Sequence, residues 1–450
     1  MHARLFSAAA DLASGRWLSE PDLAEPALQL LRSLDLVPED GGAADLRLDL
    51  VPNAPVLLQA AARLSVLFRL PASDMPGLVF VGGEADPRSL GLMAEEGAAA
   101  SLAGAALDHP SAFAACVGEG VEYLSQFVRP GDRLVPGLDL APAQLPDAGA
   151  QAAFAAWLGL ADPAELRQRR WTPGVRLDGG DAAWLPAELV FRGAAVGQGD
   201  RPPVPLGTGC SAGVSRTRAI IAALLETVER DAVALWWHGG RPGRRIAPEV
   251  LRQLDAPGLI ARLRGSASGR ETTLLDISTD LGIPCVAALS FAAEGDGFAA
   301  GFAAGIDLRR AVRSALVELG QMELGLRLVA AKRRHRGDEA LNEADWRQVQ
   351  RASGVRLGEL PILEPAADPE SGDFDGDDGE ILTALTGRLA RAGHVTYVSS
   401  LGRAEFGIPV ARVLVPTLQP FPSAHVSPRL ARIAGKNRLH PALERGIDLF

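Results

Sequence analysis

Lysine is almost absent from this chain of 450 residues. Of the 45 basic residues, only Lys332 and Lys436 are lysines. The basic residues are outnumbered by 55 acidic ones, which gives a formal net charge of -10, and they are scattered along the sequence. A protein that binds the phosphate backbone of a nucleic acid needs a surplus of Lys and Arg on one face. We therefore expect no nucleic-acid partner.

The sequence is also poor in cysteine. Its three cysteines are far apart and form no C-x-x-C pair: Cys116, Cys210 and Cys285. That spacing excludes a zinc site made from paired cysteines and is typical of a reducing compartment. Each of the three has apolar or small neighbours in the sequence, which favours a small buried side chain over a reactive thiol.

Long apolar runs are missing as well. No apolar stretch reaches the roughly 18 residues that span a membrane, and the N-terminus lacks the apolar core of a signal peptide. We expect no membrane association and a cytoplasmic location. Hydrophobic residues at 47% and charged residues at 22% are the balance of an ordinary globular protein.

The chain divides into an N-terminal helical and extended segment, 1–64, and a main unit, 65–450. Residues 5–35 predict two short helices broken near Gly15 and Pro21, and 46–50 alternates like a strand. Segments 65–70 and 78–82 predict paired strands around a turn at 71–74. Segment 128–205, rich in Pro, Gly, Asp and Arg, predicts a mixed insertion with a helix near 147–158 and a β-rich part near 184–197.

An acidic run, 373–379, lies inside a second irregular segment, 364–379, which we expect to be a flexible loop. An EF-hand calcium loop counted from Asp373 would need Gly at its sixth position and Glu at its twelfth, but Asp378 and Ala384 stand there. The run is better explained as acidic residues at the N-terminus of a helix over 380–392.

An internal repeat is the most informative feature of the sequence. Each copy has a Gly-containing turn, a polar connection and an Ala-rich helix, and each helix bears a Glu seven residues after an Ala and a further Glu or Gln three residues later. The three pairs are Glu119 with Glu122, Glu226 with Glu229, and Glu318 with Gln321. Asp108, Ser215 and Asp307 stand where helix N-caps belong. Strands that alternate with such helices predict an α/β fold built from duplicated units.

Residues three apart lie on one face of a helix, so each copy presents paired oxygen ligands. Because their neighbours are Ala, Leu, Val and Cys, these carboxylates are expected to be largely buried and to need counter-charges. Only Arg230 is adjacent in the sequence. Mg²⁺ prefers oxygen ligands and usually combines a few carboxylates with substrate phosphates. The repeat therefore indicates either a metal–nucleotide site or a purely structural duplication.

A Gly-rich loop, 206–213, precedes the second helix. Its spacing misses G-x-G-x-x-G by one residue, and the chain contains no G-x-x-x-x-G-K-[ST] motif. Backbone N–H groups of such a loop attract anions, so Gly209 and Ser211 are candidates for nucleotide contact.

These motifs together resemble the YcaO family. Residues 207–213 (GTGCSAG) followed by A-x6-E-x-x-E-R-D over 219–231 are similar to its central signature, and 104–122 and 301–321 are similar to its first and third Glu helices. The element 413–420 (VLVPTLQP) resembles its late V-P-G-L-x-P motif. The resemblance runs from about residue 65 to about residue 425, and it identifies 65–450 as a YcaO catalytic domain.

The resemblance implies a YcaO-type fold, with ATP and Mg²⁺ as cofactors and ATP-dependent activation of a backbone amide in a ribosomal precursor peptide. It implies metal binding by Glu119, Glu122, Glu226, Glu229 and Glu318, catalytic roles for Glu226, Glu229 and Arg230, and nucleotide contacts from Gly209, Ser211, Glu318, Gln321 and Arg313. The product would be thiazoline or oxazoline, formed from Cys, Ser or Thr. It also implies a separate ThiF-like leader-peptide-binding protein as a partner, with an azoline dehydrogenase as a further candidate partner. The chain itself would form a homodimer within a larger complex.

The chain departs from the family pattern at several places. Tyr123 stands where E-x-x-E-R would place Arg, Ser314 stands where many members carry Arg, with Arg313 beside it, and Thr417 replaces a Gly. The C-terminus lacks the P-x-P-x-P tail of azoline-forming members. Two alternatives stay open: a thioamide-forming YcaO enzyme, and a non-catalytic scaffold that binds nucleotide or peptide within a complex.

Overall fold

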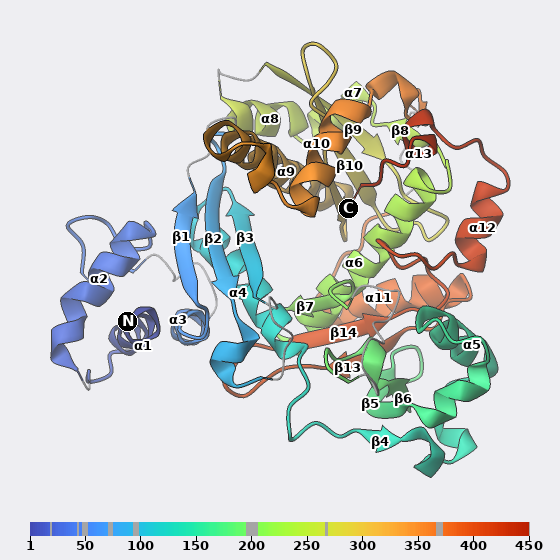
Figure 1. The fold of residues 1–450 in the computed structure, drawn as a ribbon, viewed down its shortest axis with the longest axis horizontal. Coiled ribbons are helices and arrows are strands. Elements are labelled where there is room, and N and C mark those ends of the chain that lie inside the picture. Colours follow the sequence, from blue (N-terminus) through green and yellow to red (C-terminus); the bar gives the residue numbers. More distant parts are fainter. Residues whose placement is uncertain are drawn as a thin grey trace.

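The computed structural model describes residues 1–18, 20–42, 45–46, 53–70, 75–92, 99–194, 206–265, 269–365 and 372–449. It is a mixed α/β architecture with three sheets, which confirms the predicted fold class (Figure 1). The predicted strand at 46–50 lies outside the described residues apart from its first position, as does the predicted turn at 71–74. None of the described helices is long and apolar enough to cross a membrane.

The N-terminal segment is helical and lies beside the first sheet (Figure 1). Its helices are α1 (His2–Ala13), α2 (Ala24–Ser33) and α3 (Ala54–Ala61). The break between α1 and α2 falls at Gly15 and Pro21, as predicted, because Gly15 adopts a left-handed backbone and a short 3₁₀ turn begins at Pro21. The ring of Phe6 stacks on Phe113 at 6.0 Å, so this segment shares its apolar core with the main unit.

The first sheet has three antiparallel strands in the order β1 (Val66–Leu70), β2 (Val79–Ala85) and β3 (Ala100–Ala106). This confirms the predicted pairing of the first two strands. The helix α4 (His109–Ser125) follows β3 and packs back on the sheet through buried residues such as Phe113 and Val117.

The second sheet has five strands in the order β11, β10, β9, β8, β12. Their bounds are β8 (Gly243–Arg245), β9 (Arg270–Asp276), β10 (Cys285–Ala292), β11 (Ala299–Ala304) and β12 (Ile362–Leu363). The associated helices are α7 (Pro248–Gln253), α8 (Ala256–Arg264), α9 (Leu308–Arg336) and α10 (Glu343–Gly354). Seven of the eight residues of β10 are fully buried, which agrees with its continuous run of apolar and small residues.

The third sheet joins distant parts of the chain in the order β4, β5, β13, β14, β7, with β6 paired to β5. Its strands are β4 (Val135–Pro136), β5 (Arg170–Arg176), β6 (Ala182–Pro186), β7 (Cys210–Ala212), β13 (Tyr397–Ser400) and β14 (Val410–Leu414). The remaining helices are α5 (Ala148–Trp157), α6 (Arg216–Trp237), α11 (Asp378–Arg391), α12 (Pro428–Ala434) and α13 (Pro441–Glu444). The described part of segment 128–205 is therefore built into a sheet through the pairing of β5 with β13.

The acidic run of 373–379 leads into α11, which begins at Asp378. The Asp377 side chain accepts hydrogen bonds from the backbone N–H groups of Gly379 and Glu380, as an N-cap does. The predicted helix over 380–392 is thus present, and negative charge at its start is favourable for the helix dipole.

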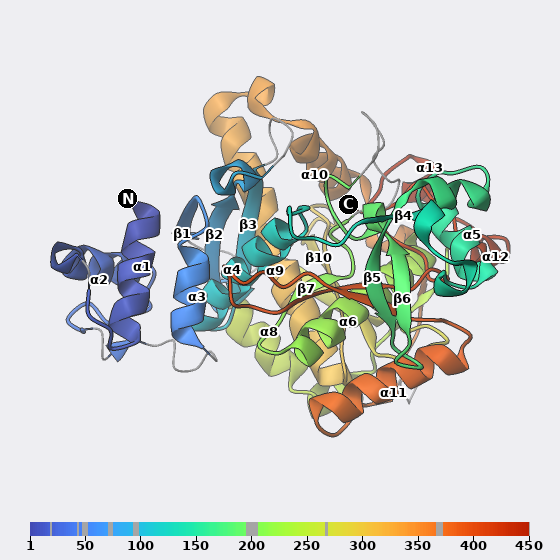
Figure 2. The same ribbon diagram turned by 90° about the horizontal axis from the view of Figure 1, so that it is seen from below.

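The sequence repeat corresponds to three strand–helix units: β3 with α4, β7 with α6, and β11 with α9. The predicted N-caps are all formed, because Asp108, Ser215 and Asp307 accept the N–H of the residue three positions later at 2.8, 3.1 and 2.7 Å. Figure 2 shows α4, α6 and α9 near the middle of the molecule. We call α4, α6 and α9 the glutamate helices.

Close packing of each helix on its own strand or turn explains why the repeat has Gly and Ala at fixed positions. A Cβ on Gly213 would lie 2.5 Å from the Ala219 nitrogen, and one on Gly305 would lie 2.7 Å from the Ala311 nitrogen. The repeated alanines of the glutamate helices, among them Ala112, are completely buried. Each glutamate helix can therefore lie directly against its own strand or turn.

We expect Gly301→Ala in β11 to lower the free energy of unfolding by about 1–3 kcal/mol, because its Cβ would overlap the backbone of Ala315 and Leu319 in α9. Chemical denaturation measures this change. Gly387→Ala in α11 is the matched control, since no atom lies within 4 Å of its added Cβ and alanine is the better helix former. Equal stability of both variants would contradict close packing of α9 on β11.

Candidate functional site

The first glutamate of each glutamate helix is tied to the backbone of its own unit. Glu119 accepts the Ala103 N–H at 2.8 Å, Glu226 accepts the Gly209 N–H at 3.0 Å, and Glu318 accepts the Phe302 N–H at 2.8 Å. The donors lie in β3, directly before β7, and in β11. One hydrogen bond of the same kind therefore sets the position of a carboxylate in all three units.

The second residue of each pair reaches the strand of the next unit. Glu122 of α4 accepts the Ala212 N–H of β7 at 2.6 Å, and Glu229 of α6 accepts the backbone N–H of Ala304 in β11. Gln321 of α9 closes the cycle by donating its amide N–H to the Ala103 carbonyl of β3 at 2.9 Å. The three units are thus linked head to tail in a ring.

This ring makes the five carboxylates face one another. The charges of Glu119 and Glu226 both act on Glu122, and the charges of Glu318 and Glu226 both act on Glu229. Glu119 is the most exposed of the five, and the others are partly buried. The glutamates predicted from the repeat are therefore brought together at the centre of the protein.

Arg230 is the counter-ion within this group. Its Nη2 lies 3.7 Å from Glu226 Oε1, and its Nε lies 3.5 Å from Glu229 Oε1. Burial disfavours its charge, but Glu229, Glu226 and Glu318 together raise the pKa of Arg230. The side chains of Arg230, Glu226 and Glu229 are 17%, 26% and 12% exposed, so all three stay partly accessible to solvent.

Arg230, even with the charge of Arg412 also acting on Glu226, does not neutralise five carboxylates. Burial raises the pKa of Glu119, Glu226 and Glu318, and it raises the pKa of Glu229 well above its usual value. Burial, together with the charges of Glu226 and Glu119, raises the pKa of Glu122 to about 8. Such carboxyl groups hold protons unless a cation replaces them.

The donor set fits Mg²⁺ and a triphosphate. In the described part of the chain no three acidic, His or Cys side chains are close enough to form a metal site by themselves. Mg²⁺ needs no such cage, because it usually takes one or two carboxylates and completes its shell with water and phosphate oxygens. The surplus of carboxylates over arginine supplies the charge that such cations would balance.

The Gly-rich loop supports a glutamate rather than offering a free anion cradle at Gly209. Gly209 has a left-handed backbone with φ +73°, and a Cβ there would lie 2.6 Å from the Val413 carbonyl, so no other residue fits. Its N–H is directed at Glu226. Ser211 lies in β7, one residue before Ala212, which holds Glu122.

Two arginines beside the site were not found from the sequence. Arg412 of β14 is 2% exposed and donates to the carbonyls of Leu206 and Thr208, which fixes the Gly-rich loop. Burial lowers its pKa to about 10. The guanidinium of Arg192 lies 5.1 Å from the ring centre of Tyr123, the residue that replaces an expected arginine. An arginine within the apolar run of β14 is the one sequence signal that could have drawn attention to Arg412.

Other predicted residues are less central. Arg313 is exposed and stands five residues before Glu318, so it leaves α9 on a different face, whereas Ser314 shares the face of Glu318. The nucleotide contact of Arg313 stays a prediction. The cysteines are buried and free, as expected, and burial raises the pKa of Cys116 and Cys210 to about 12.

One small cavity borders the third glutamate helix, and another borders the Gly-rich loop. The first, of about 20 Å³, is lined by Glu318, Met322 and Leu449, so a residue near the end of the described chain is beside the third glutamate helix. The second, of about 20 Å³, is lined by Thr208, Thr227 and Arg412 behind the Gly-rich loop.

The fold and the site together define an α/β protein with duplicated strand–helix units around a group of partly buried carboxylates. A family model described as a YcaO cyclodehydratase that binds ATP and Mg²⁺ matches residues 103–419. The chain belongs to the YcaO family, and the predicted cofactors, ATP and Mg²⁺, are confirmed at the level of the family.

Known proteins share this fold at low sequence identity. A heterocyclase solved in complex with substrate and cofactor is 20% identical with a TM-score of 0.64, over 90% of this chain and 53% of that one. YcaO from Methanopyrus kandleri, solved with AMPPCP and Mg²⁺, is 20% identical with a TM-score of 0.59, over 85% of this chain and 93% of that one. The Escherichia coli microcin synthetase McbBCD complex gives 16% identity and a TM-score of 0.53, over 78% of this chain and 88% of that one.

The chain also has a relative in sequence. An uncharacterized protein of Methanothermobacter thermautotrophicus is 26% identical over 260 residues, which are 56% of this chain and 66% of the relative. This chain thus spans slightly less than two thirds of that relative and about half of the heterocyclase.

The raised pKa of Glu122 makes stability depend on pH. A glutamate carboxyl of the unfolded chain titrates near 4.5, and Glu122 in the folded protein titrates near 8. Between these values the folded protein keeps a proton that the unfolded chain has lost, so raising the pH through this window lowers stability.

We expect Glu122→Gln to reduce this loss in the ligand-free protein, stabilising it by about 1 kcal/mol or more near pH 8 and less near pH 5. Thermal melts of both proteins over this pH range measure the effect. Glu249→Gln, on the exposed helix α7, is the control. If the melting curves of wild type and Glu122→Gln shifted in parallel with pH, a protonated Glu122 would be ruled out.

Proposed function

We propose that this chain is an ATP-dependent peptide cyclodehydratase that phosphorylates a backbone amide oxygen of a ribosomally made precursor peptide and forms thiazoline or oxazoline from Cys, Ser or Thr. The observation that carries the proposal is the ring of five carboxylates with one arginine at the centre of a YcaO fold. A purely structural duplication gives no reason to gather so much like charge.

The reaction makes a poor leaving group into a good one. A Cys, Ser or Thr side chain of the peptide adds to the carbonyl carbon, and the resulting alkoxide oxygen takes the terminal phosphoryl group of ATP, with release of ADP. Inorganic phosphate then leaves as the ring C=N bond forms, so the peptide loses the elements of water. Mg²⁺, when bound with ATP, offsets the charge of the transferring phosphoryl group.

Within this proposal, the residues of the chain have separate tasks. Glu119, Glu122, Glu226, Glu229 and Glu318 hold the cations. Arg230, already charged between Glu226 and Glu229, places positive charge beside the phosphates. Gln321, Gly209, Ser211 and Arg313 are proposed as nucleotide contacts. The Gln321 side-chain oxygen and its second amide hydrogen are still available, because only one N–H is used in the bond to Ala103. The Gly209 N–H is bonded to Glu226, and its carbonyl already accepts the Val413 N–H.

The partners are part of the proposal. The structural relatives include a heterocyclase in complex with substrate and the McbBCD complex with pro-MccB17 bound. This supports a precursor peptide and partner proteins for the present chain. We propose a ThiF-like leader-peptide-binding protein, an azoline dehydrogenase as a second partner, and a homodimer within the complex.

The proposal predicts that the chain, mixed with its precursor peptide, partner protein, Mg²⁺ and ATP, lowers the peptide mass by about 18 Da for each ring formed by side-chain attack. Mass spectrometry of the peptide measures this. A gain of about 16 Da would instead show that a sulfide source attacks the amide and that the product is a thioamide. No ATP turnover with any precursor would assign a binding scaffold.

Removing one carboxylate of the central pair should stop the chemistry. We expect Glu226→Gln and Glu229→Gln each to lower the rate of ATP hydrolysis by about 100-fold or more, since each contacts Arg230 and the charge it supplies is lost. Phosphate release measures the rate, with Glu249→Gln as the exposed control. Full activity of both variants would refute their assignment.

A further inference from the structure

Two further carboxylates lie on the backs of glutamate helices and have no part in the proposed chemistry. Asp231 follows Glu229 by two residues in α6, and Glu323 follows Gln321 by two residues in α9. Two residues turn a helix by about 200°, so both side chains leave on the side opposite the site. They are 0% and 2% exposed, which makes them more deeply buried than the site carboxylates.

Asp231 is held by an arginine from the C-terminal part of the chain. The Nε of Arg429 lies 3.0 Å from Asp231 Oδ2 and 3.1 Å from Oδ1, and the Gln419 N–H donates to Oδ1 at 2.9 Å. The other two nitrogens of Arg429 bind Asp280. The back of α6 is thereby fixed to the segment that runs from Gln419 to α12.

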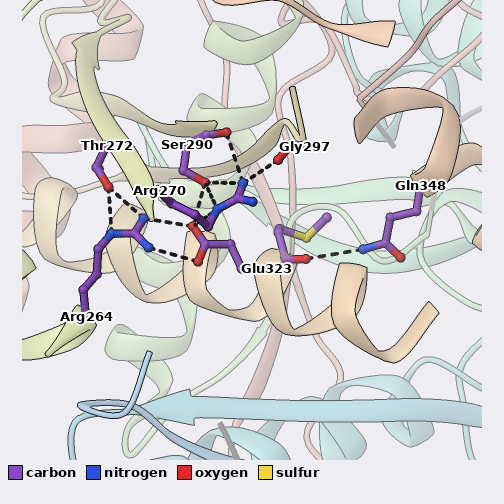
Figure 3. A network of polar contacts seen from close by, with 8 residues as sticks. Arg264, Arg270, Thr272, Ser290, Gly297, Glu323 and Gln348 are labelled. Carbon is purple, nitrogen blue, oxygen red and sulfur yellow. Dashed lines mark hydrogen bonds and ion pairs between the residues drawn. The ribbon is translucent and has the colours of Figure 1, made fainter. Parts of the chain in front are cut away.

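Glu323 is held by two arginines, as Figure 3 shows. Arg264 of α8 forms a bidentate pair with it at 2.9 and 3.1 Å, and Arg270 of β9 lies 3.2 Å from Oε1. Ser290 of β10 donates its hydroxyl to Oε1 at 2.6 Å. Thr272 accepts from Arg264 at 2.7 Å, so the network connects α9 to two strands and to α8.

The first glutamate helix, α4, is also held by an arginine, but without a buried carboxylate on the helix. Leu124 stands at the equivalent position of α4, and the end of that helix is held by Arg403, which donates to the carbonyls of Ser125 at 3.0 Å and Phe127 at 2.8 Å. Arg403 is itself paired with Asp132. An arginine therefore fixes each glutamate helix, on the back of α6 and α9 and at the C-terminal end of α4.

Such buried charge is a poor way to gain stability, because well-packed apolar residues of similar size serve as well or better. What these ion pairs do contribute is a fixed orientation of the helix, since a bidentate guanidinium–carboxylate pair allows few orientations. Each glutamate helix is bound to strands on its front through the site residues. A fixed back therefore sets its rotation and its position along the axis.

We infer that Asp231 and Glu323 are positioning residues, held by Arg429 and by Arg264 with Arg270, that orient α6 and α9 so that Glu226, Glu229 and Glu318 can bind a metal–nucleotide complex together. The inference rests on the proposed function of these glutamates. It assigns a role in ligand binding to two residues that do not touch the ligand.

Asp231→Asn and Glu323→Gln keep shape and remove the charge. We expect each to weaken the binding of a non-hydrolysable ATP analogue with Mg²⁺ by tenfold or more and to raise the Mg²⁺ concentration needed for half-saturation. Titration calorimetry of the full chain measures both, at a temperature where circular dichroism shows every variant folded. Glu323→Asp keeps the charge and should lose less affinity than Glu323→Gln.

Leu31→Ala in α2 is the control for a general loss of stability, because Leu31 is 1% exposed and belongs to the N-terminal segment. It should melt at a lower temperature and bind the analogue like wild type. If Glu323→Gln does not fold, Arg264→Lys keeps the positive charge without the bidentate pair and is expected to weaken binding in its place.

Affinities of Asp231→Asn and Glu323→Gln within twofold of wild type would overturn the positioning role and leave the proposed function intact. So would an equal loss in Leu31→Ala. A wild-type chain that binds no nucleotide would overturn the proposed function, and the positioning role with it.

Discussion

The structure depends on keeping five carboxylates close together around one arginine. Like charges at such short range repel, and partial burial makes the repulsion stronger than in water. A backbone N–H donated to each of these glutamates offsets part of this cost. Four of those donors are strand residues and the fifth, Gly209, lies directly before β7, so the site exists only because each helix lies directly on a strand or on the turn that enters it. The buried Ala positions and the close Gly contacts follow from that requirement.

The ring of units also explains why the third pair ends in glutamine. Glu122 and Glu229 meet backbone N–H groups, which a carboxylate can accept. Gln321 meets the carbonyl of Ala103, which needs a donor. A carboxylate there would face an oxygen at hydrogen-bond distance and would repel it. The difference between Glu and Gln in the repeat is therefore a consequence of which backbone group the next unit presents.

The relatives show how little sequence identity is needed to keep this fold. Identities of 16–20% accompany TM-scores of 0.53–0.64 over most of the chain. The departures of this chain from the family pattern are local. Tyr123 is accompanied by Arg192 from a distant segment, and Ser314 keeps the face of Glu318 open with a small side chain. Replacement of one residue can thus be met by a neighbour in space that is not a neighbour in sequence.

The sequence by itself determined the repeated helices, their N-caps, the paired glutamates and the fold class, because these follow from local spacing and from residue types that repeat at fixed intervals. Tertiary structure alone decided which strand each glutamate meets, that the Gly209 N–H is used by Glu226, and that Arg412 supports the loop. It also decided that segment 128–205 enters a sheet through β13. The physical reason is the same in each case: hydrogen bonds and ion pairs between distant segments depend on where the chain returns in space, and no spacing along the chain encodes that.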